Sequence, residues 1–205
     1  MARDMTSIVK RSRREGYALH PKAHKAMVKR TGPPGQQGTN RRPAKASQYS
    51  IQLREKQKVK RLYGLLERQF AKLMNEASRT KGQSGQALLI FLEQRADNVL
   101  YRAGFAPSRR GARQLITHGH FMLNGRRFDI PSVRLKIGDE LIVRDGSSNS
   151  AYFKNLDDVS PAGEVAASWL KVDRKKLMVK VSALPTREEA EPDINEQLIV
   201  EFYSR

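Results

Sequence analysis

The sequence contains no cysteine among its 205 residues. Disulfide bonds, cysteine nucleophiles and zinc sites built on thiolates are therefore excluded. Long apolar runs are also absent: no stretch reaches the roughly 18 residues of a membrane-spanning helix, and residues 1–30 lack the apolar stretch of a secretory signal. These absences favour a soluble, cytoplasmic protein with no membrane partner.

Acidic residues are scarce. The chain has 21 Asp and Glu against 39 Lys and Arg, which gives a formal net charge of +18. Residues 1–62 hold 17 of these cations, with only Asp4, Glu15 and Glu55 as anions. An imbalance of this size indicates a polyanionic partner and says little about the fold. An apolar content of 39% and a mean hydropathy of −0.64 suit a lean core better than a large catalytic scaffold.

Residues 1–46 predict a basic, extended N-terminal arm. Its stretch "TGPPGQQGTNRRP" holds prolines and glycines that exclude a regular helix or a central strand. The arm has too few apolar residues to offset the entropy of ordering it, so we expect it to be mobile until an anion holds it; a solvated tail is the alternative. His20 and His24 are four residues apart, but two histidines rarely hold zinc alone, so no metal and no other cofactor is expected.

Residues 47–94 predict a small helical domain. Apolar residues from Tyr49 to Leu65 recur near helical spacing with basic residues between them, which indicates an amphipathic helix with a cationic exposed side. A second helix is expected over about 67–80, and a third from Ser84.

Residues 95–185 predict a unit that combines helices with strands. A first short helix is followed by a second over about 109–118, with Ser108 as its N-cap, which gives a helix-turn-helix-like pair. Asn124-Gly125 is a strong signal for a β-hairpin. Further strands are expected over "DELIVRD", "WLKVD" and "LMVKVSAL", and a loop over 146–168.

The last segment, 186–205, is ambiguous between a strand and a helix capped by Asn195; we favour the helix and expect it to pack back on the helical domain. Trp169 and Phe202 are expected in the core. The predicted fold class is therefore α+β, with a basic arm, a small helical domain, and a helix-turn-helix-like pair packed on a small, mainly antiparallel β-sheet.

The stretch "SRRGARQLITHGHFMLNGRR" (residues 108–127) concentrates positive charge on a small surface. Ala112, Leu115 and Ile116 share the inner face of the expected helix, while Arg109, Arg110 and Arg113 lie elsewhere on it. No acidic residue occurs from 108 to 125, so the arginines repel one another unless an anion binds them. Phosphates suit guanidinium groups and a helix N-terminus, so we favour a phosphate-bearing partner over a merely solvated cationic helix.

DNA and RNA are both candidate partners. A reader of DNA sites needs side chains that reach base edges, whereas Gly111, Ala112 and Gln114 leave little reach between the arginines. Recognition of a folded RNA by its shape and phosphates fits better.

Several segments resemble one family. The stretch "RADNVLYRAGFAPSRRGARQLITHGHFMLNGRRFDIPS" resembles the RNA-binding module of the family of small-subunit ribosomal protein four. The segments "RREG" (13–16), "PPGQQG" (33–38), "LREKQKVKRLYG" (53–64) and "NEQLIVEFYSR" (195–205) are similar to its bacterial form. Many members hold zinc with cysteines in the arm, but Val9 and Ser12 stand where the first pair would be, so this chain resembles the cysteine-free form.

The resemblance implies a structural, non-enzymatic constituent of the small ribosomal subunit. It implies direct, early binding to the multi-helix junction in the 5′ domain of 16S ribosomal RNA, nucleation of body assembly, and a place beside ribosomal proteins three and five where mRNA enters. It further implies an effect on accuracy together with proteins five and twelve, and in some bacteria repression of the protein's own mRNA. No small-molecule substrate is implied.

From the charge pattern and the resemblance together, we expect RNA contacts at 22 positions. They are Arg11, Arg13, Arg14, Lys22, Gly35, Gln36, Arg41, Arg42, Tyr49, Arg54, Lys56, Lys58, Arg61, Arg68, Ser108, Arg109, Arg110, Arg113, His118, His120, Asn124 and Arg126.

An RNA-modifying enzyme or a ribosome-rescue factor that carries the same module is the alternative. The adjacent acidic pairs Asp157-Asp158 and Glu188-Glu189 read as surface charge, because neighbouring side chains diverge. His118 and His120 have no nucleophile arranged around them in the sequence. No catalytic residue is therefore expected.

Overall fold

The computed structural model describes residues 6–30, 32–35, 45–161 and 167–204. These residues form two compact units: one comprises the described parts of Met1–Leu88 and Asp193–Arg205, the other Leu89–Pro192. The predicted α+β class is confirmed. The finer division into an arm, a helical domain and an RNA-binding module stays a prediction.

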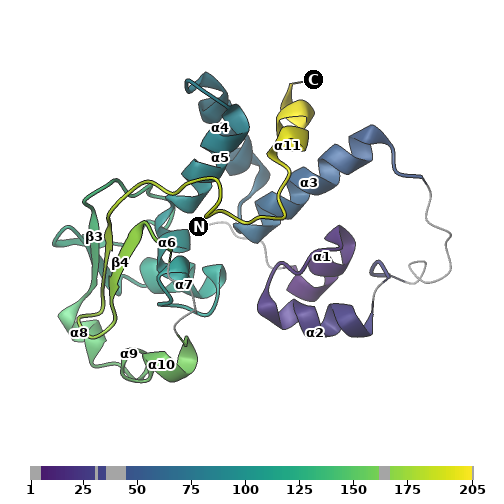
Figure 1. Cartoon of the computed structure of the whole chain (residues 1–205). Coiled ribbons are helices and arrows are strands. Elements are labelled where there is room, and N and C mark those ends of the chain that lie inside the picture. The colour runs from purple at the N-terminus through teal and green to yellow at the C-terminus, as the bar shows by residue number, and fades with distance from the viewer. Residues whose placement is uncertain (1–5, 31, 36–44, 162–166, 205) are drawn as a thin grey trace. The chain divides into compact units, whose positions relative to one another are not determined.

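The first unit is helical (Figure 1). Its helix α3 is amphipathic, and buries one face through Gln52, Lys56, Val59 and Leu62. The helix α11 packs against α3 from the far end of the sequence. The helices are α1 (Ile8–Glu15), α2 (Pro21–Lys29), α3 (Gln48–Leu62), α4 (Glu67–Arg79), the start of α5 (Ser84–Glu93), and α11 (Glu196–Tyr203).

Two local features bring α11 to its place. Asn195 caps the helix, since its side chain accepts hydrogen bonds from the backbone N–H groups of Gln197 and Leu198, which confirms the predicted helical reading. Gly85 makes room for it: a Cβ atom at this position would lie 2.7 Å from Cγ of Glu196, closer than two carbon atoms can approach.

The expectation of an extended arm is wrong for residues 8–15 and 21–29, which are helical. Local bonds order this segment: the hydroxyl of Ser12 accepts from the N–H of Leu19 at 3.2 Å, and the imidazole Nδ1 of His20 accepts from the N–H of Lys22 at 3.0 Å. The carboxylate of Glu15, whose side chain is fully buried, bonds Arg54 and Arg61 of α3. This part of the arm therefore has bonding partners within its own unit.

The second unit holds a five-stranded antiparallel sheet in the order β2-β1-β3-β5-β4. The helices α6 and α7 pack against each other beside the strands, and bury Val99, Leu100, Ala112 and Ile116 in the core shared with the sheet (Figure 1). The elements are α6 (Ala96–Arg102), α7 (Arg109–Thr117), β1 (Phe121–Leu123), β2 (Arg126–Phe128), β3 (Glu140–Val143), β4 (Leu170–Asp173) and β5 (Met178–Val181).

The predicted hairpin is confirmed. Strands β1 and β2 pair with Leu123 opposite Arg126, and the turn between them places Asn124 at φ 49° and Gly125 at φ 78°. Both residues thus adopt the left-handed backbone of a tight two-residue turn, which Asn and Gly tolerate best.

The loop predicted over 146–168 is partly wrong, because three one-turn helices occupy its first half: α8 (Asp145–Ser148), α9 (Ala151–Lys154) and α10 (Leu156–Val159). Phe153 and Leu156 from these turns are buried in the core, as is Trp169, which was expected there. Among the described residues, no helix combines the length and apolar composition needed to cross a bilayer.

Candidate nucleic-acid interface

Helix α7 turns one face to the core and another to the surface. Its cap is confirmed, since the hydroxyl of Ser108 accepts a hydrogen bond from the N–H of Gly111 at 3.2 Å. Ala112 and Ile116 are fully buried, whereas Arg110 is exposed and Arg113 is half-buried. The helix therefore carries cations beside its N-terminus, where the helix dipole also favours an anion.

Arg109 does not share this arrangement. Its guanidinium donates to Oδ1 of Asn98 at 2.7 Å and to Oε1 of Glu191 at 2.9 Å, and it lies 4.6 Å from the ring centroid of Tyr101. The expectation that it lacks a carboxylate partner is thus wrong, because Glu191 lies 82 residues further along the chain. Its side chain is only 11% exposed, so Arg109 ties three segments of the unit together.

A buried polar network fixes α6 behind α7. The carboxylate of Glu93, 1% exposed, accepts from the guanidinium of Arg102 at 2.9 Å and from the side-chain amide of Asn98 at 2.6 Å. Asn98 in turn accepts from Arg109, so the network reaches the first residue of α7. Hydrophobic periodicity in the sequence does not predict these hydrogen bonds, because they form between polar side chains that only the folded chain brings together.

The hairpin adds a second group of cations. Arg126 and Arg127 are exposed, and neither forms an ion pair with a carboxylate that the structure describes. Arg127 reaches the end of α7: a Cβ atom on Gly119 would lie 3.4 Å from its Nε. The hairpin and α7 thus meet at Gly119, and we call Ser108, Arg110, Arg113, His118, Arg126 and Arg127 together the α7–hairpin surface.

Asn124, a predicted RNA contact, has its side chain engaged within the protein. Its amide nitrogen donates to Oδ1 of Asp139 at 2.8 Å, and its amide oxygen accepts from the N–H of Glu140 at 2.9 Å. The side chain therefore holds the hairpin against the start of β3.

The two histidines at the end of α7 differ. His118 is exposed, while Nδ1 of His120 lies 3.0 Å from the hydroxyl of Ser147 and its ring packs edge-on against Phe153. Burial lowers the pKa of His120 below its ordinary value of 6.5, and the positive charges of His118 and Arg144 lower it further. His120 is therefore mostly neutral at pH 7 in the free protein.

The prediction that Lys56 lies on an exposed, cationic side of α3 is wrong. Lys56 is 5% exposed, and its ammonium bonds Glu67 at 2.7 Å and lies 4.5 Å from the ring of Phe202. Partial burial raises the pKa of Glu67, but hydrogen bonds from Lys56, Lys60 and Tyr203 outweigh it and lower that pKa to about 2. Lys56 therefore contributes to the internal packing of the unit.

The other cations of α3 are also paired within the unit. Lys58 donates to the backbone oxygen of Asp193, just before α11, and bonds the carboxylate of Glu55 on its own helix. Arg54 and Arg61 share the carboxylate of Glu15. The same stretch of sequence that predicts an RNA-binding face thus supplies much of the unit's internal ion pairing.

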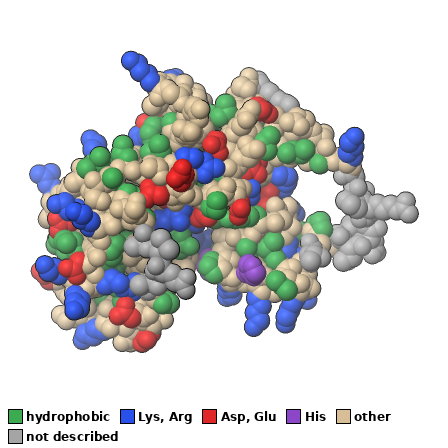
Figure 2. Space-filling view, in the orientation of Figure 1, with side chains coloured by type: hydrophobic (Ala, Val, Ile, Leu, Met, Phe, Trp, Pro, Cys, Tyr) green, Lys and Arg blue, Asp and Glu red, His purple; other side chains and the backbone are tan. Residues whose placement is uncertain are grey.

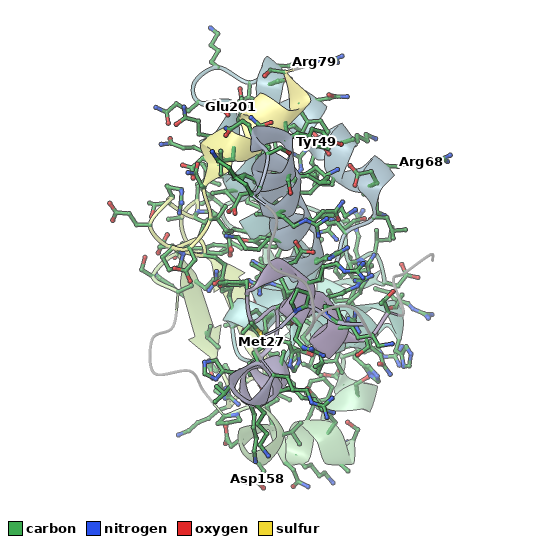
Figure 3. The ribbon with its side chains drawn as sticks, turned by 90° about the vertical axis from the view of Figure 1, so that its right-hand side faces the viewer. Met27, Tyr49, Arg68, Arg79, Asp158 and Glu201 are labelled. Atoms are coloured by element: carbon green, nitrogen blue, oxygen red, sulfur yellow. The ribbon has the colours of Figure 1, made fainter. Side chains whose placement is uncertain are left out.

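Two residues of this unit that are predicted to contact RNA, Tyr49 and Arg68, are exposed to solvent. Tyr49 is 50% exposed, with its ring 5.7 Å from that of Phe202. Phe202 itself is only half-buried, so its expected place in the core is wrong. Figure 3 shows Tyr49 beside α11 and Arg68 extending away from the ribbon.

In the arm, Arg14 and Lys22 are exposed, whereas Arg13 donates to the backbone oxygens of Gly32 and Pro33. Lys and Arg side chains project from the edge of the α2 segment in Figure 2. Arg11 is half-buried, and Gly35 is exposed with φ 115°. The predicted contacts Gln36, Arg41 and Arg42 lie outside the described residues.

One carboxylate of each acidic pair considered for catalysis has a structural partner. Asp157 bonds Arg174 at 3.1 Å. The carboxylate of Glu189 accepts hydrogen bonds from Ser168 and Thr186; burial raises its pKa, but these bonds lower it more, to below its ordinary value. Among the described residues, no cluster of three or more His, Asp or Glu side chains suits a metal ion.

Two models of known protein families match adjoining parts of the sequence. Residues 4–93 match the ribosomal protein S4/S9 N-terminal domain, and residues 94–141 match the S4 domain. Over the full length of both chains, the sequence is 50% identical to the small ribosomal subunit protein uS4 of Chloroflexus aurantiacus. The proteins of the same name from Roseiflexus castenholzii and Clostridioides difficile are 48% and 47% identical, again over the full length of both chains.

Proposed function

Because the chain belongs to the family of the small ribosomal subunit protein uS4, we propose that it is a structural constituent of the small ribosomal subunit that binds 16S ribosomal RNA directly. The α7–hairpin surface is the proposed principal contact. It grips the sugar-phosphate backbone of a folded RNA, and no chemical step is involved.

The arrangement of cations on a rigid support carries this proposal. The surface rests on a capped helix and a tight hairpin, and both are backed by a core that includes fully buried Ala112, Ile116 and Phe121. Arginine forks bind phosphate oxygens through paired hydrogen bonds, and the N-terminal N–H groups of α7 add donors in the same region. A surface of fixed shape suits RNA that is recognised by shape and phosphates rather than by base edges.

The finer assignment rests on the family resemblance. We propose that the protein binds the multi-helix junction of the 5′ domain early in assembly and nucleates the body of the subunit. It lies beside proteins three and five where mRNA enters, acts with proteins five and twelve on accuracy, and in some bacteria represses its own mRNA. The exposed cations Arg14, Lys22 and Arg68 are proposed as supporting contacts.

Filter binding tests the RNA contact. The full chain is titrated with a fragment of the 16S 5′ domain and, as a control, with a fragment of equal length from another domain, over a range of salt concentrations. Arg110→Ala with Arg126→Ala lowers affinity for the first fragment and reduces the log–log salt slope by about 0.7–0.9 for each phosphate that is no longer bound. The matched control, Lys175→Ala with Lys176→Ala, removes two exposed cations from the β4–β5 turn of the same unit and keeps the affinity. Equal reductions of affinity in both double variants would contradict a localised surface.

Sedimentation tests the assembly. A tagged copy is expected to travel in stoichiometric amounts with small subunits through a sucrose gradient. A tagged copy that stays at the top of the gradient would overturn the proposed role.

A further inference from the structure

A pocket of about 610 Å³ opens in the second unit, outside the α7–hairpin surface. It is formed by the end of α5, the segment between β2 and β3, and the chain after β5. Its lining residues are Gln94, Arg134, Leu135, Lys136, Ile137 and Leu184.

The polar lining of the pocket is cationic. The guanidinium of Arg134 lies 4.4 Å from the ring centroid of Phe91, in a cation–π contact, and Lys136 is exposed. No carboxylate is among the lining residues, which include one neutral amide, Gln94. The pocket is thus complementary to an anionic occupant that also offers a hydrogen-bonding edge.

The remaining wall is aliphatic and open to water. Ile137 is 58% exposed and Leu184 is 48% exposed, so two large aliphatic side chains of the pocket face water. Both lie on anchored backbone: the N–H of Gly138 donates to the oxygen of Val181 at 2.9 Å, and the N–H of Ser182 donates to the oxygen of Trp169 at 2.9 Å. The wall is therefore a fixed apolar surface rather than a loose loop.

We propose that this pocket takes one unstacked nucleotide of the RNA that the α7–hairpin surface binds; the inference rests on the proposed function. The base lies against Ile137 and Leu184 and on the plane of Arg134, the amide of Gln94 meets the base edge, and Lys136 meets a phosphate. Bases pulled out of a helix stack well on guanidinium planes and apolar side chains, and an amide both donates and accepts.

Hydrogen bonds connect the pocket wall to the hairpin. The N–H of Lys136 donates to Oδ2 of Asp139 at 2.7 Å, and Oδ1 of the same carboxylate accepts from the side-chain amide of Asn124. One carboxylate thus couples the pocket wall to the hairpin turn. We choose RNA over an acidic peptide because the hairpin that this carboxylate braces carries Arg126, which belongs to the proposed RNA-binding surface.

Photocross-linking tests the proposal. Ile137 is replaced by p-benzoylphenylalanine in the full chain, the complex with the 16S 5′-domain fragment is irradiated, and the cross-linked nucleotide is mapped by primer extension. We expect one dominant stop at an unpaired nucleotide. The control places the same photoreactive residue at Val159, which is 41% exposed and outside the pocket, and gives no such stop.

Affinity provides the second readout. Ile137→Ser with Leu184→Ser is expected to weaken binding of the fragment by about fivefold or more, because the aliphatic surface that the base would cover is removed. Ile130→Ser with Val159→Ser, at two aliphatic positions of the same unit that are 51% and 41% exposed, leaves the affinity unchanged. Far-UV circular dichroism checks that the four exposed positions tolerate serine.

The outcomes separate the two proposals. If the fragment binds and depends on Arg126, but position 137 gives no RNA stop, or cross-links to a neighbouring protein in reconstituted subunits, the nucleotide pocket is overturned and the α7–hairpin surface stands. If the fragment does not bind at all, both are overturned.

Discussion

Helices α3 and α7 carry similar clusters of positive charge and use them differently. On α3, Lys56, Lys60, Arg54 and Arg61 all bond carboxylates of their own unit. Beside α7, the exposed arginines of the hairpin face no described carboxylate, while Arg109 is drawn inward by Glu191. A basic run in a sequence therefore indicates either internal pairing or a polyanion, and only tertiary contacts distinguish the two.

The largest expected effect comes from breaking the internal pairing. Glu15→Ala leaves Arg54 and Arg61 without their shared carboxylate, and should lower the free energy of unfolding by about 3 kcal/mol, because that carboxylate is fully buried. Urea unfolding followed by far-UV circular dichroism measures this decrease. Fluorescence of Trp169, the single tryptophan, follows the second unit and should keep its midpoint. Asp193→Ala, which removes an exposed carboxylate of the same unit, is the control.

A comparison of Arg109→Ala with Arg113→Ala distinguishes an arginine of α7 that stabilises the fold from one that binds RNA. Arg109→Ala breaks the bonds to Asn98 and Glu191 and should destabilise the second unit by about 2 kcal/mol, seen as an earlier Trp169 fluorescence transition. Arg113→Ala should reduce the salt slope of RNA binding by about 0.7–0.9, a slope that Arg109→Ala should leave unchanged. The opposite pattern would mean that Arg113 serves the fold and Arg109 the RNA.

These two arginines also mark how far sequence reasoning reaches. The helix over Glu67–Arg79, the Ser108 cap, the hairpin and the α11 cap all follow from short-range signals, and the structure confirms them. Short-range signals do not predict the ion pairs of Glu15 and Glu191, because the arginine partners lie 39 to 82 residues away in the sequence. The helices of the arm are not predicted either: local bonds of Ser12 and His20 and the ion pairs of Glu15 with α3 support them, while their composition alone resembles a solvated tail.

A smaller effect concerns Glu67 and acid stability. The pKa of this carboxyl is about 2 in the folded chain, against an ordinary 4.5. Its contribution is therefore complete above about pH 4.5 and is lost as the pH falls toward 2. Glu67→Gln should lower the circular-dichroism melting temperature at pH 6 and make little difference near pH 2. Asp193→Asn should show no such pH-dependent difference.

The smallest effect is on the pH dependence of RNA binding. An adjacent phosphate favours protonated imidazole, so binding should take up a proton at His120, whose pKa is lowered by burial in the free chain, and affinity should rise by about two- to threefold from pH 8 to pH 6. His120→Gln, which removes the imidazole that takes up the proton, should reduce this rise. A rise of the same size in the variant would assign the proton uptake elsewhere.

The packing of α11 on α3 has a consequence for the time order of folding. The N–H of Asn195 bonds the carboxylate of Glu55 across 140 positions, so the first unit closes only after the whole of Leu89–Pro192 has left the site of peptide synthesis. The second unit is continuous and can fold as soon as it emerges, since contacts between distant residues form late. The α7–hairpin surface thus needs no residue beyond Pro192, whereas α3 gains its partner helix only from residues 193–205.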